Sequence, residues 1–138
     1  MMCHGMVDRV IIAVHNEDVP TKNEWDSYLY TEEEAIKINK ITGIFVYTSG
    51  EGPSSVQRKQ LAALLGKYKI NIPCSVVTDS VLGRGIVTAV SWFAGKHVRS
   101  FSSLEMKQAM DHLGISDYSS FLKKLDDLGR QINVQIPS

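Results

Sequence analysis

The sequence predicts a single α/β domain with a mainly parallel sheet and helices on its flanks. Short apolar runs rich in β-branched residues alternate with amphipathic segments of helical period along the chain. The runs are apolar throughout, as expected for strands that helices cover on both faces. A length of 138 residues suits one domain with one core. We therefore expect four strand–helix units with right-handed crossovers, and leave a fifth strand open.

The first strand is predicted over residues 7–15, "VDRVIIAVH", which form a continuous β-rich apolar run. A helical region follows over residues 22–40, with a break expected near Tyr30. Thr31 and Glu34 have the spacing of a capping box, so we expect the helix to restart there. The acidic run that begins with Glu32 is interpreted as a solvated helix start.

The second strand is predicted over residues 44–47, and a helix over residues 54–68 follows it. Ser54 or Ser55 suits the N-cap of this helix, and Pro53 is tolerated where a helix begins. The remaining elements are a third strand over 72–79, a helix over 80–93, a fourth strand over 97–102, a helix over 104–113 that Gly114 ends, and a last amphipathic helix over 117–132.

Charge and composition exclude some classes of partner. Fifteen basic and fifteen acidic residues give a formal net charge of zero. This balance argues against nucleic-acid binding through a broad basic surface. It also leaves little charge to oppose self-association, so a homodimer is compatible with the sequence.

The location is predicted to be cytoplasmic, and no cofactor is predicted. Cys3 and Cys74 have no metal-type spacing, and two lone thiols are typical of a reducing compartment. No apolar run approaches the ~20 residues of a membrane span. The N-terminal residues lack the basic region and apolar stretch of a signal peptide.

A turn rich in glycine and hydroxyl groups, residues 48–55, is the first candidate site. Gly50 and Gly52 permit positive φ, and such turns at the carboxyl ends of parallel strands can hold a phosphate. No lysine follows as in a P-loop, the GxGxxG spacing is absent, and Glu51 would repel a phosphate. An ordinary capped turn is therefore favoured over a nucleotide-binding loop.

A second candidate site lies where the third predicted strand meets the next helix. Asp79 and Ser80 lie at this junction, and Arg84 follows about one turn later. This acid, hydroxyl and guanidinium could bind a small anion or a partner's backbone, although a helix cap beside a solvent-facing arginine explains them more simply. His15 ends the first strand at the same edge of the sheet, so a ligand pocket could form from these residues and the turn.

Catalysis is a weaker alternative. A Ser–His–acid triad could be assembled from His15, Asp79 and either Ser49 or Ser80, but no GxSxG nucleophile motif is present. The histidines show neither HxH nor HExxH spacing, so no metal site is predicted. We therefore expect a protein that is not an enzyme, with a small hydrolase kept as an alternative.

The element order resembles the STAS domain family, whose members include anti-sigma-factor antagonists. The resemblance covers about residues 7–113, chiefly by topology, and Phe101-Ser102-Ser103-Leu104-Glu105 with Ala109 match the family's closing motif. It implies a STAS-like fold and a regulatory, non-catalytic role. The helix over residues 117–132 would extend past the family core and act as a lid or a dimer arm.

The resemblance also implies a phosphorylation site. Bacterial antagonists of this kind carry a serine, in a segment like Asp-Ser-Ser-Gly after the central strand, that a partner kinase phosphorylates. By topology this segment falls on Tyr47-Thr48-Ser49-Gly50, which makes Ser49 the candidate. Tyr47 stands where the family has an acidic residue, and Pro53 lengthens the turn. Asp79-Ser80-Val81-Leu82-Gly83 matches the motif better in letters but follows a different strand.

The function that these features favour is docking of a protein partner through the turn and its hydroxyl groups, Thr48, Ser49, Ser54 and Ser55. A phosphate in the turn would add about two negative charges, which either repel beside Glu51 or order the turn at the following helix. The alternatives are a protein that binds a lipid or an anion at the strand ends, and an oligomeric scaffold that uses its last helix.

Overall fold

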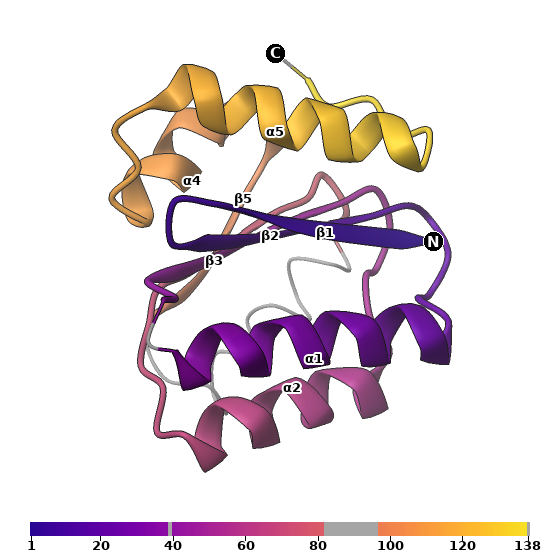
Figure 1. Cartoon of the computed structure of the whole chain (residues 1–138). Helices are drawn as coiled ribbons and strands as arrows, with labels where there is room; N and C mark the ends of the chain where they lie inside the picture. The colour runs from indigo at the N-terminus through magenta and orange to yellow at the C-terminus, as the bar shows by residue number, and fades with distance from the viewer. Residues whose placement is uncertain (39, 82–96, 138) are drawn as a thin grey trace.

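The computed structural model describes residues 1–38, 40–81 and 97–137. It is built in three layers, with a central sheet between two layers of helices (Figure 1). Helices α1 (Lys22–Lys37) and α2 (Ser55–Lys67) cover one face of the sheet, and α4 (Met106–His112) and α5 (Tyr118–Gln131) cover the other. The helix predicted over 80–93 lies almost entirely outside the described residues, as does Arg84.

Within the described residues, the sheet has five strands whose order in space follows their order in the sequence. Strand β1 is antiparallel to β2, and each later strand is parallel to its predecessor. The strands are β1 (Met2–Val7), β2 (Val10–His15), β3 (Gly43–Thr48), β4 (Cys74–Val77) and β5 (Val98–Phe101). The predicted α/β class and mainly parallel sheet are confirmed, and the strand that the sequence left open is present.

That additional strand corrects the predicted boundaries at the N-terminus. The run over 7–15 was expected to be one strand, but β1 and β2 form a hairpin in which Val7 pairs with Val10. Asp8 makes the two-residue turn with a φ of 53°, a conformation that aspartate tolerates better than most residues. The turn was missed because Asp8 and Arg9 interrupt an apolar run only briefly.

Helix α1 (Lys22–Lys37) also differs from the prediction, because it continues unbroken past Tyr30. Its capping box is formed by Thr21 and Glu24, not by Thr31. The Thr21 side chain accepts from the Glu24 backbone N–H at 3.2 Å, and the Glu24 carboxylate accepts from the Thr21 N–H at 2.9 Å. Thr31 and Glu34 repeat the motif inside the helix. The backbone amides there already donate to helical carbonyl groups, so they need no cap.

The other described helices agree more closely with the sequence. Ser54 caps α2 (Ser55–Lys67) as predicted, through a box with Gln57. The segment over 104–113 is divided into a short 3₁₀ turn, η1 (Ser103–Glu105), and α4 (Met106–His112). Beyond α4, Gly114 takes a φ of 73°, which favours glycine. The last helix is α5 (Tyr118–Gln131), capped by Asp117.

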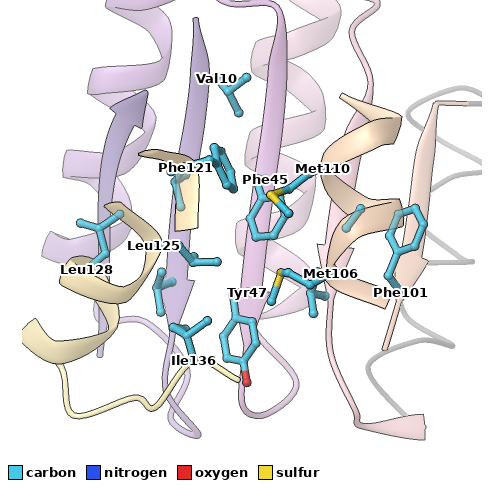
Figure 2. Close-up of a cluster of buried hydrophobic side chains, with 14 of the residues drawn as sticks. Val10, Phe45, Tyr47, Phe101, Met106, Met110, Phe121, Leu125, Leu128 and Ile136 are labelled. Carbon is cyan, nitrogen blue, oxygen red and sulfur yellow. The ribbon is translucent and has the colours of Figure 1, made fainter. Parts of the chain in front are cut away.

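Strand residues alternate between two apolar cores, one on each face of the sheet. The core beneath α4 and α5 is shown in Figure 2, where Phe45 of β3 meets Phe121 of α5 edge-on with ring centroids 4.9 Å apart. Leu125 and Leu128 of α5 are buried in the same core. The apolar side of the last helix is therefore covered by the sheet, unlike that of a free arm.

Candidate functional site

A cavity of about 120 Å³ lies on the opposite face of the sheet, beneath α1 and α2. Ile44, Val46 and Val76 form its wall on the sheet side. Leu61 and Leu65 of α2 face them from the helix side. The cavity is therefore mainly apolar, and it adjoins the second core of the protein.

Strand register explains which polar groups reach this cavity. Alternate residues of β3 point to the same face, so Thr48 follows Ile44 and Val46 on the cavity side. The parallel pairing of β2 with β3 sets His15 directly beside Thr48. Both residues line the cavity where their strands end, which is the edge at which parallel sheets bind ligands.

His15 is a buried, neutral imidazole in this environment. Its side chain is 1% exposed, and Nδ1 has no hydrogen-bond partner among the described residues. Burial lowers the pKa of His15 to about 4, and the N-terminal amine lowers it further while Glu24 opposes the shift. The site therefore contains an uncharged histidine at neutral pH.

The inner side of α1 brings three polar side chains against the second core. Trp25, Tyr28 and Glu32 are spaced by three and four residues, so they share one helix face. Trp25 and Tyr28 line the cavity with ring centroids 5.2 Å apart. The indole Nε1, the tyrosine hydroxyl and both Glu32 carboxyl oxygens are buried without a hydrogen-bond partner in the described part of the chain.

Glu32 is fully buried, with 0% of its surface exposed, which corrects the prediction of a solvated acidic run. Burial raises its pKa to about 7, while the nearby Tyr28 hydroxyl opposes the rise without reaching hydrogen-bond geometry. Burial also raises the pKa of Cys74 to about 12, and the negative charge of Glu32 adds to that rise. The spacing from Trp25 and Tyr28 was the sequence signal that places Glu32 inside.

The mouth of the cavity is formed by the glycine turn and the start of α2. Glu51, Gly52 and Pro53 line it, together with Arg58 from the first turn of the helix. The Arg58 guanidinium donates to the Pro53 carbonyl oxygen at 2.7 Å. Residue 52 takes a φ of 75°, which explains why it is a glycine, Gly52.

The backbone of the turn is largely engaged within the protein. The Gly50 N–H donates to the Thr48 hydroxyl oxygen at 3.2 Å, and the Ser49 N–H donates to the His15 carbonyl at 3.2 Å. The Ser54 N–H donates to the Gln57 side chain. A Cβ at Gly50 would lie 3.0 Å from the Glu17 carbonyl oxygen, so glycine is required there by close packing. These contacts are those of a capped turn.

The candidate hydroxyl groups of this turn differ in exposure. Ser49 and Ser55 are exposed, whereas Thr48 is buried and donates to the Gly50 carbonyl oxygen. Ser54 is committed to the N-cap of α2, where its side chain accepts from a backbone N–H. Of the predicted modification sites, Ser49 and Ser55 are therefore the accessible ones.

Asp79 and Ser80, the described residues of the second predicted cluster, do not line the cavity. Asp79 accepts from the Ser103 N–H at 2.9 Å, and the Ser80 N–H donates to the Thr78 hydroxyl at 3.1 Å. The sequence placed both clusters at one edge of the sheet, but only the turn and His15 meet at this cavity.

The triad considered for a hydrolase is not assembled from these residues. A triad histidine binds its carboxylate through Nδ1, but this atom of His15 has no partner among the described residues. Asp79 is instead bonded to the backbone near η1.

The described residues form neither a metal-binding cluster nor a membrane-spanning helix. Within residues 1–38, 40–81 and 97–137, no group of three histidine, cysteine or acidic side chains is placed to hold a metal ion. No helix of the described chain is both long and apolar enough to cross a membrane.

Comparisons with protein-family models, curated proteins and solved structures gave no match.

Proposed function

We propose that this protein binds a small, largely apolar molecule in the cavity beneath α1 and α2. The observation that carries this proposal is a space of about 120 Å³ with apolar walls, which reaches the carboxyl edge of a parallel sheet. An apolar cavity of about 150 Å³ is large enough to bind benzene. The expected ligand is therefore close to one ring, or a branched chain of similar size.

The packing of the two sheet faces supports this proposal. Protein interiors are normally close-packed, so an apolar space of this size is unusual. On the α5 side, Phe121, Leu125 and Leu128 are buried against the sheet. On the α2 side, Leu61 and Leu65 are only half-buried and border the cavity. A ligand between α2 and the sheet would cover this apolar surface.

The protonation states support binding over catalysis. With its pKa lowered to about 4 by burial, His15 is a poor general base at neutral pH. Burial raises the pKa of Cys74 to about 12, which keeps its thiol protonated and weakly nucleophilic.

Filling the cavity tests this proposal. Ala62 lines the cavity, whereas its neighbour Ala63 is exposed and points away. Toluene should bind the wild-type protein saturably in an NMR titration of the amides around the cavity. We expect Ala62→Phe to weaken this binding by about tenfold or more, because the new ring occupies the space. Ala63→Phe should bind toluene like the wild type.

Two results would contradict the proposal. One is an absence of saturable toluene binding by the wild-type protein. The other is equal binding by a folded Ala62→Phe protein, which would place the toluene elsewhere.

A second proposal, favoured by the exposure of Ser49, is a STAS-like regulatory role. In this proposal the turn docks onto a protein partner, and phosphorylation of Ser49 changes that docking. Ser49 is exposed and lies three residues before the cavity-lining Gly52, so a kinase can reach it without unfolding the strand. A phosphate there would add about two negative charges beside Glu51.

Intact-mass spectrometry of protein purified gently from its own cells tests this second proposal. We expect the mass of one added phosphate, which disappears in a Ser49→Ala protein and persists in Ser55→Ala. An unmodified mass under all growth conditions would contradict it. The same spectra, recorded under native conditions, would reveal a co-purified ligand.

A further inference from the structure

We infer that the ligand carries one anionic group, which lies on Arg58 at the cavity mouth while the apolar part of the ligand enters the cavity. This inference rests on the proposed binding function and adds the ligand's charge and orientation to it.

Arg58 is a basic residue that lines the cavity. Its side chain is half-buried and lines the cavity, and one N–H of the guanidinium donates to the Pro53 carbonyl at 2.7 Å. A guanidinium has five N–H donors, so this bond holds the group in place and leaves most of its donors available. The ion pairs of the described residues do not include Arg58. A fixed cation at an apolar opening suits an anion.

Glu51 is the competing charge, because it also lines the mouth. Its side chain is exposed, so water and salt screen its field strongly. Arg58 is half-buried, and a charge with less water around it acts more strongly on a bound group. The attraction by Arg58 should therefore exceed the repulsion by Glu51.

The far end of the cavity determines the orientation. Ile72, Cys74 and Val98 line the cavity near the starts of β4 and β5, at the sheet edge opposite the glycine turn. A charge moved among such side chains without a partner costs several kcal/mol. The Glu32 carboxyl lies near Tyr28 and Cys74, so it would also disfavour an anion at that end. The anionic group should consequently remain at the mouth, with the apolar part inside.

Three probes of the same shape test the charge. They are 4-methylbenzoate, 4-methylbenzamide and 4-methylbenzylamine, titrated by calorimetry at low ionic strength. We expect the benzoate to bind about tenfold more tightly than the amide, since charge-assisted hydrogen bonds are stronger than neutral ones. The amine should bind most weakly.

Variants at the mouth test the position. Arg58→Gln should reduce benzoate affinity to the level of the amide and change amide affinity by less than about twofold. Arg58→Lys should keep part of the preference, because it retains the charge but not the fork of donors. Glu51→Gln, the matched control that removes the acidic charge at the mouth, should leave or increase the preference.

The inference is overturned if the amide binds as tightly as the benzoate, if the amine binds most tightly, or if folded Arg58→Gln keeps the full preference. These results differ from failure of the proposed function, in which toluene does not bind either. If toluene binds but benzoate is not preferred over the amide, the inferred anionic group is ruled out and the proposed binding function stands.

Discussion

Replacing Glu32 with glutamine is expected to increase the free energy of unfolding by about 3 kcal/mol at pH 8. The reason is that the wild-type protein at pH 8 buries a negative charge that no ion pair or hydrogen bond among the described residues compensates. The pKa of Glu32 is raised from 4.5 to about 7 by that burial. Glutamine has nearly the same shape and never ionises, so it avoids the cost of burying a charge.

The pH dependence has a definite sign. Between pH 4.5 and 7 the unfolded chain releases the Glu32 proton while the folded protein retains it. Stability from this group is therefore fully present below pH 4.5 and falls as the pH rises to about 7. The neighbouring Tyr28 and Cys74 stay protonated throughout, because burial raises the pKa of each.

His15 contributes the opposite slope. Its pKa is lowered from 6.5 to about 4, so the unfolded chain binds a proton in this range and the folded protein does not. Stability from His15 is therefore full above pH 6.5 and falls as the pH falls towards 4. In the wild type the two slopes nearly cancel between pH 4.5 and 6.5.

Urea unfolding at intervals from pH 4.5 to 8 checks this prediction. Glu32→Gln should show stability that rises with pH up to about 6.5, because only the His15 contribution remains. Glu34→Gln is the control, since Glu34 is exposed and its ion pair with Lys37 contributes at most about 1 kcal/mol. Parallel wild-type and Glu32→Gln curves across the whole range would show that Glu32 does not titrate as described.

Replacing Phe121 with alanine is expected to destabilise the protein by about 3–5 kcal/mol. Phe121 is 1% exposed, and its ring packs edge-on against Phe45 of the central strand β3. Removal of the ring loses this contact and leaves a cavity between α5 and the sheet. Leu122→Ala is the matched control, because the neighbouring Leu122 is only half-buried.

Two measurements on Phe121→Ala, its urea unfolding curve and its mass by size-exclusion chromatography, distinguish a core helix from a dimer arm. If α5 is part of the core, Phe121→Ala lowers the midpoint of a single cooperative transition and leaves the mass in solution unchanged. A change in mass with no change in stability would instead indicate the dimer arm that the sequence left open.

Local signals were sufficient to predict much of the fold. The helix over 54–68 was placed correctly because its cap, Ser54, and its apolar period are both local features. The break near Tyr30 was wrongly predicted because two segments carry the same capping motif, and only packing selects Thr21. Strand β1 was missed because "MCHGMV" has no clear alternation and its turn depends on positive φ at Asp8.

The sequence predicted only those parts of the candidate site whose positions follow from the order and direction of the strands. His15 and the glycine turn were expected at the carboxyl edge, because parallel strands bring their ends together. Arg58 and the α1 side chains were not expected, since the side that a helix turns inward depends on how it packs. Glu32 was misread because an acidic run normally lies in solvent.

The position of α5 has a consequence for how the protein is made. The thiol of Cys3 in β1 donates to the Leu128 carbonyl oxygen of α5 at 3.0 Å, which joins the first strand to the last helix. A ribosome completes β1 to β5 before it adds α5, so one apolar face of the nascent sheet waits with only α4 to cover it. Such a face is the kind of surface that chaperones bind and that aggregates when synthesis stalls. Biogenesis is therefore most vulnerable just before the last helix emerges.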